Sequence, residues 1–196
     1  SVELRMLRLQ GERLADIVLA APEDMGLQRL AERSPEARID VRGVTFRYAD
    51  NEADVLQGLS LAIEPGESVA IVGPSGGGKT TLLKLMLGIH APQNGEVRVG
   101  GLPLAQLGLA QWRSMVGTVM QDDALLTGSV IDNISFFDAS PDVEWVMECA
   151  RLAAVHDEIE GMPMGYHTLI GDMGASLSGG QKQRLLLARA LYKRPQ

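Results

Sequence analysis

Cysteine is almost absent from this chain of 196 residues, since Cys149 is the only one. A disulfide framework is therefore excluded, and this composition is typical of a protein from a reducing compartment. Cys149 falls in a helical pattern over residues 143–155. We therefore expect it to be a buried packing residue and not a reactive thiol.

The chain also lacks an excess of positive charge. It has 18 basic and 25 acidic residues, which gives a net charge of −7 and a pI near 5.0. This balance disfavours a nucleic-acid partner, because such partners usually require a basic surface. It does not disfavour a small phosphorylated ligand, because local backbone amides and one lysine can bind a phosphate group.

Long apolar runs are missing as well, so the sequence predicts no membrane span. No signal peptide is visible, and the first residue is Ser1 instead of Met. We therefore expect this chain to be a piece of a longer protein. Hydrophobic residues make up 45% and charged residues 22% of it, as in a globular domain. Many of the 22 glycines fall in two short motifs and their neighbourhood.

The chain divides at about residue 36. Residues 3–20 carry a helical apolar stripe, and residues 22–35 are polar and read as a linker. The stripe fits a surface helix packed on the domain, and it fits equally the tail of a longer helix from upstream. After residue 37 the pattern changes to short strands, and after Gly128 to helices.

The apolar patterns predict particular elements. Strands are expected over residues 39–48, with an interruption at Gly43, and over 55–63, 68–72, 96–99 and 116–120. Helices are expected over 79–87 and from Pro141, which would take the first helical position. This order indicates an α/β core that carries a helical subdomain.

A phosphate-binding pattern, G-x-x-x-x-G-K-[ST], covers residues 73–80. It reads Gly73, Pro74, Ser75, Gly76, Gly77, Gly78, Lys79 and Thr80. It follows a predicted strand and opens a predicted helix, the context in which glycines let backbone N–H groups converge on a phosphate. The pattern assigns Lys79 to the β- and γ-phosphates and the Thr80 hydroxyl to Mg²⁺.

A second glycine turn precedes the last predicted helix. It reads Leu177, Ser178, Gly179, Gly180 and Gln181. Such a turn would place a hydroxyl and free amides at a helix N-terminus, which makes a second anion site. Two anion sites far apart in one chain suggest that they serve one nucleotide across a dimer.

With these two motifs, residues 37–196 resemble the nucleotide-binding domain of ATP-binding cassette (ABC) transporters. The resemblance implies an α/β P-loop NTPase core with N-terminal antiparallel strands and a helical signature subdomain. The core would cover residues 37–124 and the C-terminal end, and the helical subdomain about 125–190. Residues 1–36 would be a connector from the last transmembrane helix with a linker.

The resemblance also implies the ligands and the residues that hold them. Tyr48 is expected to stack on the adenine of ATP. The phosphate loop, residues 73–80, and the adjoining Thr81 are expected to bind ATP, as is Gln121 at the end of a predicted strand. Mg²⁺ is expected at Thr80 and Gln121. Alternatively, Tyr48 is a half-buried aromatic and Gln121 an ordinary strand end. The residues expected to bind the ATP of a second, head-to-tail copy are Ser178, Gly179, Gly180 and Gln181.

Three further segments resemble exporters. Residues 125–134 are similar to the surface that receives coupling helices of the membrane domain. Residues 168–174 are similar to the exporter X-loop, with Asp172 where Glu is usual, although Asp172 could instead cap a turn. Residues 7–24 are similar to connectors of colicin V exporters, which carry a leader peptidase. The resemblance implies export of a bacteriocin-like peptide from the cytoplasmic face of the bacterial inner membrane.

In the family, the catalytic acids come after a segment that residues 193–195 resemble. The 196 residues do not include those acids. The resemblance therefore assigns no catalytic residue here, and we expect these residues to bind ATP without hydrolysing it. We also expect an exposed apolar sheet edge, with lower stability or self-association. His90, His156 and His167 have no mutual spacing for a metal or relay, and we interpret them as incidental.

Two other functions remain open. One is a non-transport ABC ATPase that acts as a clamp in DNA maintenance or translation, against which residues 3–20, residues 125–134 and the acidic charge all argue. The other is a naturally truncated regulatory nucleotide-binding module. The sequence on both sides of this chain would decide between these functions and the exporter.

Overall fold

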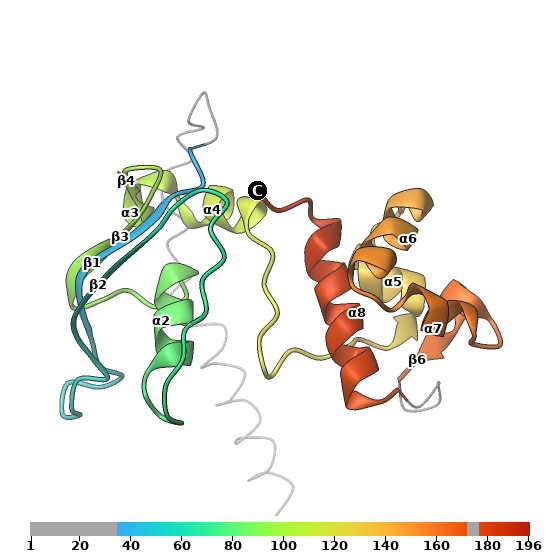
Figure 1. The fold of residues 1–196 in the computed structure, drawn as a ribbon, viewed down its shortest axis with the longest axis horizontal. Coiled ribbons are helices and arrows are strands. Elements are labelled where there is room, and N and C mark those ends of the chain that lie inside the picture. Colours follow the sequence, from blue (N-terminus) through green and yellow to red (C-terminus); the bar gives the residue numbers. More distant parts are fainter. Residues whose placement is uncertain (1–34, 172–176) are drawn as a thin grey trace, which may run out of the picture.

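The computed structural model describes residues 35–171 and 177–196. Most of the predicted connector, residues 1–36, lies outside the described residues, as does Asp172. The described residues form two halves, an antiparallel sheet with its adjoining helices and a helical subdomain (Figure 1). A long connection after α4 joins the two halves.

The first half is built on a four-stranded antiparallel sheet in the order β2-β1-β3-β4. Val41, Val44 and Phe46 are buried, so one face of β1 lies in the core. The predicted interruption at Gly43 is confirmed, because the pairing with β2 shifts register between Val41 and Val44 and Gly43 has φ 57°. The strands are β1 (Ile39–Phe46), β2 (Leu56–Ile63), β3 (Asn94–Val99) and β4 (Leu102–Pro103).

Helix α2 (Lys79–Met86) contributes Leu82 and Leu85 to the same core as the buried β1 side chains. Two short helices, α3 (Leu104–Leu107) and α4 (Leu109–Met115), follow the sheet. Trp112 of α4 is buried in this core, and its indole Nε1 donates a hydrogen bond of 2.9 Å to the Met86 carbonyl at the end of α2. The C-terminal end of the helix that begins at the phosphate loop is therefore held against α4.

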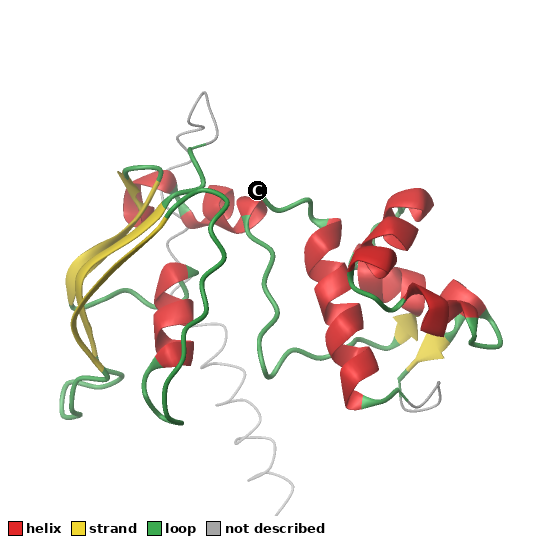
Figure 2. Ribbon diagram, viewed as in Figure 1, coloured by secondary structure: helices red, strands yellow, loops and turns green. Residues whose placement is uncertain are grey.

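The second half is mainly helical and includes one two-stranded ladder (Figure 2). Its elements are β5 (Gly128–Ser129), α5 (Val130–Ser135), α6 (Val143–Leu152), α7 (His156–Glu160), η1 (Gly165–His167), β6 (Leu169–Ile170) and α8 (Gly179–Tyr192). The predicted start of α6 is wrong by two positions, because the first helical residue is Val143 and not Pro141. Asp142 caps the helix by accepting from Trp145 N at 3.0 Å, which leaves Pro141 outside the first helical position.

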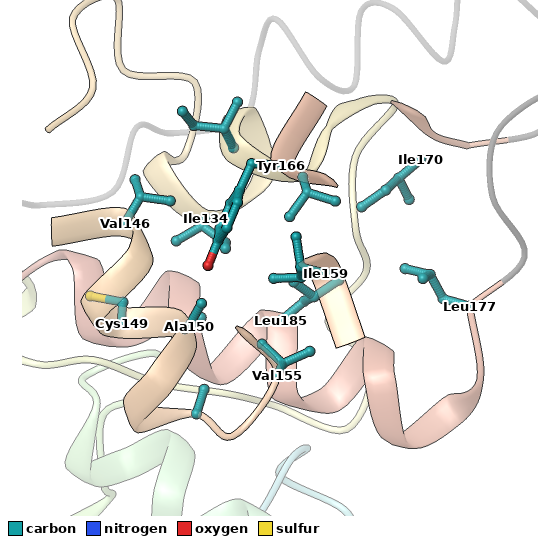
Figure 3. Packing of buried hydrophobic residues seen from close by; sticks show 14 residues of the cluster. Ile134, Val146, Cys149, Ala150, Val155, Ile159, Tyr166, Ile170, Leu177 and Leu185 are labelled. Atoms are coloured by element: carbon teal, nitrogen blue, oxygen red, sulfur yellow. The ribbon is translucent and has the colours of Figure 1, made fainter. Parts of the chain in front are cut away.

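The core of the helical subdomain surrounds Leu185 of α8, which is fully buried (Figure 3). Ile134 of α5 belongs to the same cluster, as do Val155 and Ile159 at the cap and within α7. Cys149 is also fully buried, which confirms the packing role predicted for it. Burial raises the pKa of its thiol to about 11, so the thiol stays protonated at neutral pH.

Two predicted strands are wrong. Residues 68–72 and 116–120 have no strand pairing among the described residues. A strand requires a neighbour in hydrogen-bonding register, and an apolar run by itself does not provide one. Val69 is 47% and Val72 87% exposed, but the run belongs to no sheet, so the predicted apolar sheet edge is not formed here. Residues 116–120 line an apolar cleft of about 540 Å³.

The two halves meet where α8 ends. Gln196 N donates to the Met115 carbonyl at 3.0 Å, and Lys193 Nζ donates to the Arg113 carbonyl at 3.3 Å. A side chain at Gly117 would place its Cβ 2.7 Å from the Ala190 carbonyl oxygen, so this approach requires glycine. No helix in residues 35–171 or 177–196 has the length and apolar character needed to cross a membrane.

Replacing Leu185 by alanine tests the helical core. Leu185→Ala removes a fully buried side chain, and we expect it to lower the free energy of unfolding by about 2–5 kcal/mol. Leu187 lies on the same helix and is 42% exposed. Leu187→Ala should change stability by less than about 1 kcal/mol. Urea denaturation followed by circular dichroism measures both, and similar losses for the two variants would contradict the assigned core.

Candidate phosphate and nucleotide site

The predicted phosphate loop lies directly before α2, at the foot of that helix in Figure 1. Gly76 and Gly78 both have φ 79°, in the left-handed region that residues with a Cβ rarely adopt. Gly77 N donates to the Pro74 carbonyl at 3.2 Å and closes the turn. The glycines of the motif therefore shape the loop.

The N-terminus of α2 is open to an anion. Gly78 is its N-cap and has no side chain to accept a hydrogen bond from the first turn, and that turn contains no acidic residue. An α-helix leaves its first N–H groups without intrahelical partners and carries partial positive charge at this end. An approaching phosphate would meet both.

Lys79 adds a full positive charge to the loop. Its Nζ donates to the Gly73 carbonyl at 2.9 Å and to the Pro74 carbonyl at 2.6 Å, so the ammonium lies over the start of the loop. These partners are neutral carbonyl groups, and Lys79 forms no ion pair with a carboxylate among the described residues. The charge therefore remains available to a phosphate.

The residues predicted to hold Mg²⁺ are Thr80 and Gln121, and both are exposed. Gln121 was predicted to end a strand, but it lies in a turn instead. In this turn, Met120 N donates a hydrogen bond to Asp123 Oδ2 at 2.8 Å. Within residues 35–171 and 177–196, no group of three or more His, Cys, Asp or Glu side chains could hold a metal ion. A Mg²⁺ ion here would therefore depend on nucleotide phosphates and water for most of its ligands.

Tyr48 lies two residues beyond the end of β1 and is 53% exposed. Its ring is nearly perpendicular to those of Phe46, at 5.1 Å between centroids, and His90, at 5.6 Å. Its hydroxyl forms a hydrogen bond of 2.9 Å with Thr81 Oγ1. Tyr48 is therefore an exposed aromatic ring held beside the start of α2, a suitable surface for stacking a base.

Two further contacts lie at this surface. The His90 ring stacks on Phe46 with centroids 5.3 Å apart and contacts Tyr48. The Thr81 side chain is buried and bonds Tyr48, and its role as an ATP ligand stays a prediction. Neither contact has a sequence signal, because β2 and the phosphate loop separate Tyr48 from both residues.

The second glycine motif begins α8. Ser178 Oγ accepts from Gln181 N at 3.2 Å, and Gln181 Oε1 accepts from Ser178 N at 2.8 Å, which forms a capping box. Leu177 anchors the turn in the helical core, while Ser178, Gly179 and Gly180 are exposed. The motif therefore presents an ordered helix N-terminus to solvent.

The two motifs belong to different halves of the structure. In the view of Figure 1, α2 and α8 both begin at the lower end of the molecule, on opposite sides of the long connection. Only the phosphate loop has Tyr48 beside it, through the bond to Thr81. One copy of the described residues therefore provides one base-and-phosphate surface and a separate second helix N-terminus.

Arg189 connects α8 to the segment after the Gln121 turn. Its guanidinium donates to the Ala124 carbonyl at 3.0 Å, the Asn133 carbonyl at 2.8 Å and Asn133 Oδ1 at 2.7 Å. The buried Asn133 side chain also bonds the backbone of Leu126 in both directions. Burial lowers the pKa of Arg189, and the Asp123 carboxylate opposes that shift.

The sequence profile of the ABC transporter family matches residues 56–196. Among curated proteins, the colicin V secretion/processing ATP-binding protein CvaB of Escherichia coli is 45% identical over 196 residues. The alpha-hemolysin translocation ATP-binding protein HlyB of Escherichia coli O6:H1 is 42% identical over 183 residues, 93% of this chain. The chain spans 28% of the length of the first relative and 26% of the second.

A solved bacterial Atm1-family ABC exporter with ATP bound has a similar structure. The TM-score is 0.82 at 30% sequence identity, over 97% of this chain and 33% of that one. This similarity confirms the predicted fold class, a mixed α/β ABC ATPase fold with antiparallel strands and a helical subdomain. With the profile match over more than half of its residues, the chain belongs to the ABC transporter family.

Proposed function

We propose that this chain is the ATP-binding domain of a bacterial ABC exporter that moves a peptide, such as a bacteriocin, across the inner membrane. The observation that carries the proposal is the phosphate loop, in which Lys79 lies over a glycine turn at the uncapped start of α2. The family match and the exporter structure support it.

In this proposal, different groups of the chain bind different parts of ATP. The amides of residues 76–80 and the N-terminus of α2 hold the phosphates, and Lys79 neutralises part of their charge. Tyr48 stacks on adenine. Thr80 and Gln121 would hold Mg²⁺, which would offset the negative charge of the phosphates.

The peptide cargo is proposed from the relatives. Their names describe secretion or translocation of colicin V, microcin H47 and alpha-hemolysin. The words "secretion/processing" in two of these names support a leader peptidase elsewhere in the parent protein. The proposed partners are a membrane domain, whose coupling helices would meet residues 125–134, and the cargo it carries.

A second copy of the domain is the other proposed partner. The Ser178 turn would complete the ATP site of that copy, so two nucleotides would lie between two head-to-tail domains. The ordered capping box at Ser178 supports this role, because it presents exposed residues 178–180 on a helix N-terminus.

We further propose that these 196 residues alone bind ATP without hydrolysing it. Hydrolysis by P-loop proteins requires a group that orients the attacking water. The phosphate loop contains no carboxylate or histidine, and its only ionisable side chain is the cation Lys79. In the parent exporter, acids outside these residues would supply that group.

Lys79→Ala tests the phosphate loop. Loss of a charge-assisted hydrogen bond to phosphate typically costs about 1.5–3 kcal/mol, so we expect ATP affinity to fall about ten- to hundredfold. Lys84→Ala is the matched control, because it removes a lysine from the last turn of the same helix. Calorimetric titration with Mg²⁺ and ATP measures both. Unchanged affinity in Lys79→Ala would disprove the phosphate-binding role.

Ser178→Arg tests the contact between copies. In the complete nucleotide-binding domain we expect each copy to retain ATP binding but to lose ATP-dependent dimerisation, because a long cation would fill the exposed turn. Ser178→Ala removes the helix cap without adding bulk and controls for its loss, which costs about 1 kcal/mol. Sedimentation velocity with and without ATP gives the result, and dimerisation of Ser178→Arg equal to wild type would refute the contact.

A further inference from the structure

We propose that Gln93 is a positioning residue that fixes the main chain beside Tyr48 and thereby sets where a nucleotide base can stack. Gln93 lies directly before β3 and outside both glycine motifs. The inference rests on the proposed function, because it concerns the placement of the same base surface. It gives Gln93 no contact with the nucleotide, since the effect passes through Arg47, the residue before Tyr48.

The Gln93 side-chain amide bonds the Arg47 main chain in both directions. Arg47 N donates to Gln93 Oε1 at 3.0 Å, and Gln93 Nε2 donates to the Arg47 carbonyl at 2.8 Å. Gln93 N also donates to the Thr45 carbonyl at 3.1 Å. Gln93 therefore holds β1 through its own main chain and the first residue after β1 through its side chain.

These two bonds begin where the pairing of the sheet stops. Thr45 of β1 faces Asn94 of β3, and the same antiparallel register would place Arg47 opposite Pro92. Proline has no backbone N–H, so it cannot exchange two hydrogen bonds with Arg47. The Gln93 amide offers one donor and one acceptor, as a peptide unit would. Its side chain therefore extends the ladder beyond the end of β3.

The Arg47 side chain carries this restraint across the connection between β1 and β2, residues 47–55. Its Nε forms an ion pair with Asp54 Oδ1 at 3.2 Å, and its Nη1 donates to the Asp50 carbonyl at 3.3 Å. Both partners follow Tyr48 in the same connection. Each residue of such a segment loses backbone freedom when it is ordered. Gln93 anchors the residue from which these ordering contacts extend.

The position of Tyr48 depends on this anchor because the residue is 53% exposed. The rings of Phe46 and His90 contact it edge-on, which orients its ring, while Arg47 fixes the main chain that carries it. A ring that is held in advance loses less conformational freedom when a base stacks on it. ATP should therefore gain affinity from Gln93, and inorganic triphosphate, which has no base, should gain none.

Calorimetric titration of the 196-residue chain with ATP and with inorganic triphosphate, both with Mg²⁺, tests this inference. Gln93→Met and Gln93→Ala both remove the two side-chain bonds, and methionine keeps the length of the side chain. Gln57→Met is the matched control, because Gln57 is an exposed glutamine of β2. Tyr48→Ala, alone and combined with Gln93→Met, shows whether the effect passes through the ring.

We expect Gln93→Met and Gln93→Ala each to weaken ATP binding about two- to tenfold, the range for the net loss of a neutral hydrogen bond. Both should bind triphosphate as the wild type does. In the Tyr48→Ala background, Gln93→Met should cause no further loss, because the ring whose position it sets is gone. Gln57→Met should bind both ligands with wild-type affinity.

Three results would overturn the inference. They are unchanged ATP affinity in both Gln93 variants, equal losses for ATP and triphosphate, and a loss from Gln93→Met that persists in full without the Tyr48 ring. In each case wild-type binding of ATP would stand, and with it the proposed function. Wild-type ATP affinity in Tyr48→Ala would refute the stacking role together with this inference. If the wild type bound neither ligand, the proposed function itself would fail.

Discussion

The contact between Gly78 and the start of β2 is the constraint on which the site depends. A Cβ at this position would lie 2.9 Å from Leu56 Cδ2, and the residue has φ 79°, so only glycine fits without strain. This contact sets where α2 begins and which way its N-terminus faces. The position of Lys79, the uncapped amides and the bond from Thr81 to Tyr48 all follow from it.

The elements that the sequence predicts well are those governed by local contacts. The glycine break at Gly43, the helix after the phosphate loop and the start of α8 each depend on residues a few positions apart. The runs 68–72 and 116–120 have equally apolar sequences but no strand pairing in the described residues. Whether such a run becomes a strand is decided by a distant neighbour, which no local pattern contains.

The same difference between local and distant contacts determines which parts of the site can be predicted from the sequence. The shape of residues 73–80 follows from their own backbone preferences, so the motif alone predicts the phosphate loop. The base surface, in contrast, is assembled from rings on three segments: Phe46 in β1, Tyr48 beyond it and His90 after α2. The sequence identifies Tyr48 only through the family resemblance. It gives no reason to connect that ring with His90 or with the Thr81 hydroxyl, because those contacts exist only after folding.

The capping box of α8 bears on how a second copy would recognise ATP in the proposed dimer. Ser178 and Gln181 form hydrogen bonds with each other within one chain, so the turn needs no ligand to become ordered. A surface that is ordered in advance loses little conformational freedom on association, and more of its contact energy remains as affinity. Arg189 extends this rigidity along the helix to the segment after Gln121, through Ala124 and Asn133. If a nucleotide closed the two copies against each other, α8 would therefore move as one rigid body. The movement of α8 would reach the surface that is proposed to meet the membrane domain.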